Sequence, residues 1–266
     1  MSQFETSGKM YRTFEVLRSH LSLWIDTTVA SSIGAPTGLE DIAAALERVG
    51  GPDAVVLNPG QAERLAEGFG GRGRPALIMR LDWTNVFRQK THPIPCSEPV
   101  YCPIALPDEA LSLGASAVMV TLLLGFDETF EADNVRQVAR FARQASKENI
   151  PIAIDVRPLG SRVNEENLAD TVLLGASMAL ELGADIIVVP YSGKDALDIA
   201  LSFVSVPIVL DIDCGPRDEG RVPLRAASQA GVRCVLLREG LFATDAIEAE
   251  IEGIRAIQKD SAKDIT

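Results

Sequence analysis

Charged side chains stand at the ends of short apolar runs in this sequence, where they could bind or transform a small molecule. Side chains alternate along an extended chain, so two charges separated by one residue point to the same side. Charges this close to apolar runs are rarely buried without partners. We expect either a ligand site or a ring of ion pairs, formed by Asp26, Arg80, Asp82, Asp155, Arg157, Asp211, Asp213, Arg217 and Arg238.

Two glycine turns next to arginines predict a binding site for phosphate or carboxylate. One turn follows an apolar run that ends at Ile212, and the other follows the last apolar run of the chain. Backbone amides in such turns can face an anion, and a guanidinium can bind it bidentately. Two ordinary glycine turns are the alternative. The expected substrate-binding residues are Arg80, Gly215, Arg217, Arg238 and Gly240.

Lys194 is a candidate nucleophile in the segment YSGK, at the start of an expected helix. A helix N-terminus and neighbouring arginines both disfavour the protonated amine, which would help the lysine to attack a carbonyl. The alternative is a solvated lysine at a helix start.

Asp155, Asp211 and Asp213 could instead hold a divalent metal through oxygen ligands, and such an ion would polarise a carbonyl without any lysine. Apart from this alternative, the sequence predicts no cofactor. The catalytic candidates are Asp26, Asp155, Arg157, Lys194 and Asp211.

These candidates need a scaffold that brings the ends of several strands together. Apolar, β-branched runs alternate with amphipathic segments eight times, which fits a single-domain (β/α)8 barrel over residues 1–266. An open doubly wound sheet uses the same alternation, but no GxGxxG turn follows the first run. A proline-rich insertion over residues 83–105 should cover the barrel mouth. Strands are expected at 21–26, 54–57, 76–82, 117–122, 151–156, 185–189, 207–212 and 234–237, and helices at 39–49, 60–68, 106–113, 133–147, 164–182, 194–204, 223–230 and 244–258.

Composition limits the partners. The 266 residues are 47% hydrophobic but only 5% aromatic, which suits a parallel barrel filled with aliphatic side chains. A net charge of −12 disfavours nucleic acid and membrane surfaces, so a small anionic metabolite would need a local basic patch. The polar start of the chain and four cysteines without a CxxC pair indicate reduced thiols in the cytoplasm.

Several segments, in order and spacing, resemble the archaeal-type class I fructose-bisphosphate aldolases, a branch of the family that includes deoxyribose-phosphate aldolase. They are GAPTGLED after Asp26, DEALSLGASAVMV, IPIAIDVRPLG, ALELGADIIVVPYSG, VPIVLDIDCGPR and LLREGLF. The resemblance implies a (β/α)8 barrel, lyase activity on a sugar-like substrate and a ring-like homo-oligomer.

The same resemblance exposes two departures. The family's imine-forming lysine aligns with Val188, and its tyrosine proton donor aligns with Arg157, while Asp26 keeps the family's strand-one carboxylate. Valine cannot form an imine, and arginine stays protonated. The leading hypothesis is a lyase acting on a small phosphorylated or carboxylated sugar-like substrate by another mechanism. The competing hypothesis is an altered paralogue that binds an anionic metabolite or a partner subunit. A different reaction on the same scaffold is a third.

Overall fold

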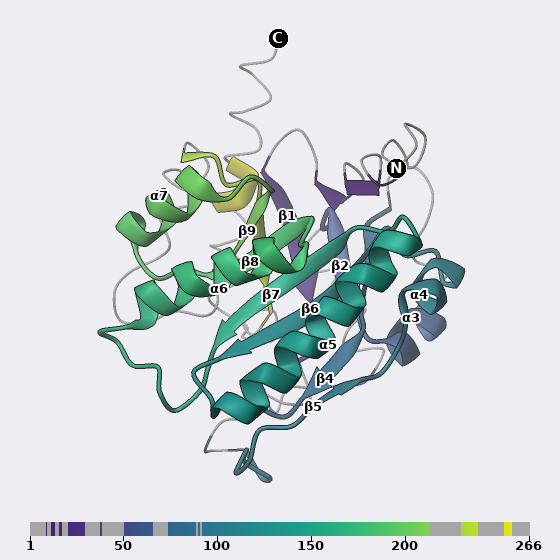
Figure 1. Ribbon diagram of the computed structural model, residues 1–266. Helices are drawn as coiled ribbons and strands as arrows, with labels where there is room; N and C mark the ends of the chain where they lie inside the picture. The colour runs from purple at the N-terminus through teal and green to yellow at the C-terminus, as the bar shows by residue number, and fades with distance from the viewer. Residues whose placement is uncertain are drawn as a thin grey trace.

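Parallel strands close into a barrel in the order β1-β10-β9-β8-β7-β6-β3-β2, with helices on its outer side (Figure 1). This confirms the predicted (β/α)8 architecture. The computed structural model describes residues 9, 12–13, 16–17, 21–29, 38, 51–65, 74–88, 90, 92–212, 230–238 and 253–256.

The elements have the following bounds. The barrel strands are β1 Ser22–Asp26, β2 Ala54–Leu57, β3 Ala76–Arg80, β6 Ala117–Leu124, β7 Ile152–Pro158, β8 Ile186–Pro190, β9 Ile208–Asp211 and β10 Cys234–Leu237. A separate antiparallel pair is formed by β4 Asp82–Thr84 and β5 Tyr101–Pro103. The helices are α3 Pro59–Leu65, α4 Pro107–Ser112, α5 Glu128–Lys147, α6 Leu168–Leu182 and α7 Lys194–Phe203.

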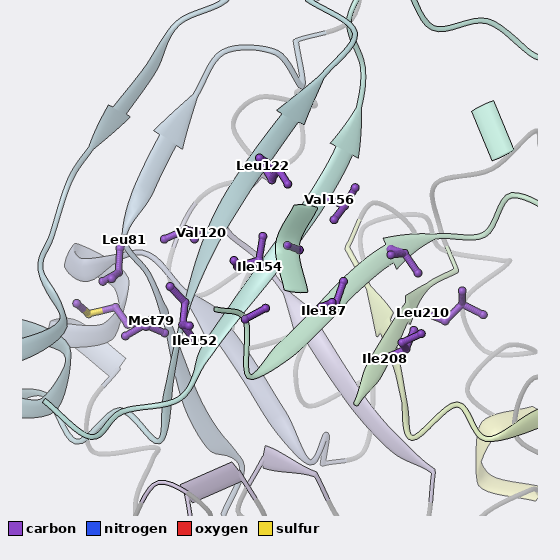
Figure 2. Close-up of a cluster of buried hydrophobic side chains, with 14 of the residues drawn as sticks. Met79, Leu81, Val120, Leu122, Ile152, Ile154, Val156, Ile187, Ile208 and Leu210 are labelled. Atoms are coloured by element: carbon purple, nitrogen blue, oxygen red, sulfur yellow. The ribbon is translucent and has the colours of Figure 1, made fainter. Parts of the chain in front are cut away.

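Two apolar layers result from the alternation of side chains along each strand. Ile187 and Val189 of β8 point outward and pack in the layer between strands and helices, which Figure 2 shows for several strands. Ile186 and Val188 point inward and pack in a second layer inside the barrel. Because nearly every strand residue is buried on one side or the other, the strands are continuous apolar runs rather than alternating ones.

Val188 lies in the inner layer, as the alignment with the family's lysine position requires. It is fully buried and lies in register with Asp155 on β7 and Val209 on β9. Hydrocarbon therefore occupies this position in the barrel, directly beside a strand that carries a carboxylate.

The prediction of one strand over residues 76–82 was wrong. The Leu81 amide donates to the Met119 carbonyl at 3.0 Å, but the Leu81 carbonyl accepts from Ile104 at 2.8 Å. Asp82 then begins β4, which pairs with β5 outside the barrel. The insertion expected as a loop over residues 83–105 is thus partly a two-stranded sheet, because its second arm returns to hydrogen-bond with the end of the third barrel strand.

Most of the described helix boundaries differ from the predicted ones by a few residues. Helix α5 begins five residues before the predicted start because the Asp127 side chain caps it, accepting from Phe130 N at 3.0 Å. Helix α6 begins four residues late, since the Asn164 side chain folds the preceding segment into turns. Its end at Gly183, with a left-handed φ of 96°, is as predicted.

Other predicted elements fall outside the described part of the chain. These are the helix at 39–49, the helix at 223–230 apart from residue 230, and most of the helix at 244–258, of which residues 253–256 are helical. Within the described residues, no helix is both long enough and apolar enough to cross a membrane.

Candidate functional site at the carboxyl ends of the strands

One layer of charged side chains lies immediately above the inner apolar layer. In β1, Trp24 is apolar and inward, and the next inward residue is Asp26; in β3 the same step leads from Ile78 to Arg80. The period of two along each strand therefore places charges at one level of the barrel. None of the following is more than 4% exposed: Asp26, Arg80, Asp155, Arg157, Asp211 and Arg238.

Arg157 joins two carboxylates of this layer. Its Nε donates to Asp155 Oδ1 at 2.7 Å, and its Nη2 donates to Asp211 Oδ2 at 2.5 Å. The prediction that Asp155 and Arg157 point to the same side is confirmed. Both hydrogen bonds are charge-assisted, the strong class of protein hydrogen bond.

Arg238 reaches across the barrel to the same carboxylates and to a third one. Its nitrogens lie 3.2 Å from Asp155 Oδ2, 2.9 Å from Asp211 Oδ2 and 3.2 Å from Asp26 Oδ2. Arg238 follows the last strand and Asp26 ends the first, so this contact ties together the strands at which the barrel closes.

Arg80 completes the ring between Asp26 and Asp155. Its Nη2 lies 2.8 Å from Asp26 Oδ2 and 3.2 Å from Asp155 Oδ2, and its Nε donates to Thr28 Oγ1 at 2.7 Å. Thr28 in turn donates its amide and hydroxyl to Asp26 Oδ1. Nη1 of the same arginine donates to Thr121 Oγ1 at 2.8 Å. Both Asp26 oxygens thus accept hydrogen bonds or ion pairs.

The electrostatics keep Asp26 and Asp155 ionised. Burial by itself would raise the pKa of Asp26, but Arg80 and Arg238 outweigh it and hold the pKa below its usual value. For Asp155, burial is likewise outweighed, first by Arg157 and then by Arg238 and Arg80, so its pKa lies far below the ordinary range. A carboxylate with a lowered pKa is a weak general base at neutral pH.

Asp82 connects the charged layer to the insertion. Its Oδ2 accepts from Thr121 N at 2.5 Å and its Oδ1 lies 3.4 Å from Arg80. Burial raises the pKa of Asp82 despite these contacts. The Tyr101 hydroxyl of β5 also faces Asp82, and burial together with that carboxylate raises the Tyr101 pKa well above 10.0. The hydrogen bond between Asp82 and Thr121 therefore joins the β4–β5 pair to strand β6 of the barrel.

Phe87 of the insertion lies over the charged layer. Its ring centroid is 5.8 Å from the Arg238 guanidinium carbon, and the side chain is 8% exposed. Beside it is a cavity of about 10 Å³, lined in part by Thr28, Arg80 and Asp82. That volume holds about one water molecule. This cavity is by itself too small for a sugar phosphate.

Lys194 does not join the charged layer. It is the first residue of α7, its side chain is 67% exposed, and it pairs with Asp198 one turn along the same helix. The hydrogen bond and charge of Asp198 raise the pKa of Lys194. The expectation that its surroundings disfavour the protonated amine was wrong, because the helix supplies a carboxylate at the position four residues on.

The other described lysines also lie away from the inner apolar layer. The sequence has six lysines, of which Lys9, Lys90, Lys147 and Lys194 are described. Lys9 pairs with Asp185, just before β8 and hence at the amino end of the barrel. Lys90 and Lys147 are exposed, in the insertion and at the end of α5. No described lysine therefore occupies an imine-forming position inside the barrel.

The structure brings together part of the predicted site. Arg80 and Arg238, predicted to bind substrate, turn their guanidinium groups onto buried carboxylates, so binding an anion through either would require an ion pair to open. In the described part of the chain, no three His, Cys, Asp or Glu side chains are placed to hold a metal. Asp213, Gly215, Arg217 and Gly240 lie outside the described residues.

Comparison with known proteins identifies the family. The family model described as DeoC/LacD family aldolase matches residues 21–204. The chain belongs to this aldolase family. An uncharacterized aldolase of Saccharolobus solfataricus is 30% identical over 221 residues, covering 80% of this chain and 79% of the relative.

A named enzyme matches this DeoC/LacD family member over a shorter stretch of sequence. A class 1 fructose-bisphosphate aldolase of Thermoproteus tenax is 34% identical over 148 residues, which are 56% of this chain and 51% of that enzyme. The crystal structure of an archaeal fructose 1,6-bisphosphate aldolase superimposes with a TM-score of 0.71 at 22% identity, covering 94% of this chain and 98% of that one. This last likeness concerns the fold.

Sequence reasoning missed several residues of the site. Thr28 and Thr121 hold Asp26, Arg80 and Asp82 in place, yet a threonine at the end of an apolar run gives no signal of its own. Phe87 and Tyr101 were hidden in a segment expected to be a loop, although aromatic residues are rare in this chain.

Proposed function

We propose that this aldolase-family protein binds a small phosphorylated or carboxylated, sugar-like metabolite at the barrel mouth and has lost carbon–carbon lyase chemistry. One observation carries the proposal. Val188, which the resemblance aligns with the family's lysine, lies in the inner apolar layer, and the charged groups above this layer pair with one another. Such a centre stabilises the barrel and offers no nucleophile.

The chemistry of an imine aldolase needs groups that the described site lacks. An amine inside the barrel must attack the ketone, and a second group must exchange a proton. Asp26 has a lowered pKa and is held by Arg80 and Arg238, so it accepts protons poorly. Arg157 cannot release one at neutral pH. Tight binding of a substrate in its ground state would not lower the remaining barrier.

A lyase with a different mechanism is the second candidate, and the retained carboxylate Asp26 favours it. In that case the ligand's own phosphate or carboxylate would compete for Arg80 and Arg238 and so free Asp26 to act as a base. The relatives named class 1 fructose-bisphosphate aldolase support a carbon–carbon bond as the target.

Further parts of the proposal concern the setting of the protein. We place it in the cytoplasm as a homo-oligomer that needs no cofactor. Three cysteines in the described residues, Cys96, Cys102 and Cys234, are free thiols, which supports a reducing compartment.

Borohydride trapping tests the loss of imine chemistry. The protein is incubated with dihydroxyacetone phosphate and borohydride, and its intact mass is measured, with an archaeal Schiff-base-forming aldolase as positive control. We expect no mass adduct on this protein. An adduct that maps by peptide analysis to any of the six lysines would overturn the proposal.

A coupled assay of fructose 1,6-bisphosphate cleavage, with and without a divalent metal, separates the two candidates. We expect a flat baseline in both conditions, whereas turnover only with metal would favour Asp155, Asp211 and Asp213 as ligands.

Binding of the anionic ligand is measured by calorimetry with dihydroxyacetone phosphate. Arg217→Ala should weaken it by about 1.5–3 kcal/mol, one charged hydrogen bond, and Arg64→Ala on exposed α3 should not.

A further inference from the structure

Helix α5 carries a stripe of cations on its exposed side. The helix lies across the outer side of the barrel over β6 and β7 (Figure 1). Its buried face is formed by Asn134, Val138, Phe141, Ala142 and Ala145. At 3.6 residues per turn, the opposite face presents Arg136, Arg140, Arg143 and Lys147, all of which are exposed.

The positive charge of the stripe is opposite in sign to the net charge of the whole chain. Residues 134–147 contain these four cations and no carboxylate, although the chain has 37 acidic and 25 basic residues. The carboxylates at its two ends are Asp133, which pairs with Arg136, and Glu148. Within the described residues, Arg140 and Arg143 have no ion-pair partner. In a chain of net charge −12, an exposed arginine should more often find a carboxylate than another arginine.

Neither helix stability nor the helix dipole accounts for this arrangement. Like charges four residues apart destabilise a helix by about 0.2–0.5 kcal/mol. The dipole favours cations only within the last turn, and α5 ends at Lys147. Arg136 and Arg140 lie well before that turn. Some exposed basic side chains elsewhere in the described residues do have local partners, as Lys194 does with Asp198 and Arg162 with Glu131.

A surface hollow lies among the side chains of the stripe. Arg136, Gln137, Arg140 and Arg143 line a surface hollow of about 290 Å³. At a rise of about 1.5 Å per residue, three arginines spread over about 10 Å of helix. The guanidinium groups donate hydrogen bonds and accept none, and the Gln137 amide adds a further donor. One phosphate can pair with one arginine, whereas a chain of phosphates can follow the row.

We propose that the exposed face of α5 binds a small polyanion that carries two or more phosphate or carboxylate groups, at a site separate from the barrel mouth. The ligand bridges Arg140 and Arg143, and Arg136 and Lys147 extend the site at either end. The net charge of the chain opposes a long nucleic acid, which would reach beyond the stripe over acidic surface.

Calorimetry with inorganic tripolyphosphate as the probe tests this site. The full-length protein should bind tripolyphosphate at least about tenfold more tightly than orthophosphate, because more than one charged hydrogen bond forms. The double variant Arg140→Gln/Arg143→Gln should weaken tripolyphosphate binding by at least about tenfold. Its circular dichroism and melting temperature should match those of the wild type, since both side chains are exposed.

The control variant Arg64→Gln/Lys90→Gln removes the same charge from exposed positions elsewhere and should keep the wild-type affinity. Equal weakening in both variants would show a general charge effect and overturn the site. Unchanged binding in the α5 variant would overturn it as well. Tighter binding of a single-stranded octanucleotide than of tripolyphosphate would assign the stripe to nucleic acid and refute the small polyanion.

Discussion

Replacing Arg157 with methionine should destabilise the protein far more than the loss of an exposed ion pair. Arg157 is 1% exposed and joins Asp155 and Asp211 through hydrogen bonds of 2.7 and 2.5 Å. Methionine has a similar unbranched stem but no charge. Removing one partner of a buried ion pair costs about 3–5 kcal/mol, because the remaining charge stays buried without compensation. We expect the free energy of unfolding to fall by that amount at pH 7.

The charges of the described layer explain why the loss is this large. The charged layer sets three carboxylates, from Asp26, Asp155 and Asp211, against three guanidinium groups, from Arg80, Arg157 and Arg238, which gives 3 − 3 = 0. Arg157→Met changes this to −1, with the Asp82 carboxylate beside the layer.

The difference in stability between wild type and variant should depend on pH in a defined direction. In the wild type the pKa of Asp155 is lowered, so its stabilising contribution is present above the unfolded pKa of about 3.9 and is lost as the pH falls below it. In the variant the pKa of Asp155 should rise, because the loss of Arg157 removes the strongest of the charges that lower it. Protonation then relieves the repulsion, so the difference in stability between wild type and variant should shrink from pH 7 to pH 5.

Urea denaturation followed by circular dichroism measures both effects. The matched control is Arg136→Met, which removes an exposed pair with Asp133 on α5 and should cost no more than about 1 kcal/mol. A loss below about 1 kcal/mol for Arg157→Met at pH 7 would refute the closed, buried network. A deficit that grows toward pH 5 would refute the assignment of the charges.

Three further predictions follow from individual contacts. Gly160→Ala should lower the free energy of unfolding, measured by urea denaturation, by about 1–3 kcal/mol or more. Its added Cβ would lie 1.8 Å from the Gly125 carbonyl carbon, whereas the Cβ added by the control Gly60→Ala meets only the flexible end of Arg64 at 3.2 Å. Phe87→Ala should cost about 3–5 kcal/mol in the same assay, and a loss under about 1 kcal/mol would show that the ring does not pack over Arg238. In an absorbance titration, Tyr101, one of three tyrosines, should stay protonated at pH values where an ordinary tyrosine ionises, and Tyr101→Phe should abolish that late step.

The sequence by itself determined the barrel and the level of its charges. Eight alternating units predict the closed sheet, and the two-residue period along each strand predicts that Asp155 and Arg157 share one side. These features are local, because side-chain direction depends only on the backbone of the same strand. That Val188 and Arg157 stand at the positions of the family's lysine and tyrosine stays a prediction, because it depends on alignment along the chain and not on contacts.

Only the tertiary structure decided which charges meet. Asp26 and Arg238 lie more than two hundred residues apart, and they pair because parallel strands β1 and β10 close the barrel in one register. Tyr101 reaches Asp82 because the insertion folds back onto the end of β3. Lys194 stays in solvent because Asp198, four residues along the exposed side of α7, pairs with it there. Such partners depend on strand order and register, which are set by packing of the whole barrel, so no short stretch of sequence contains them.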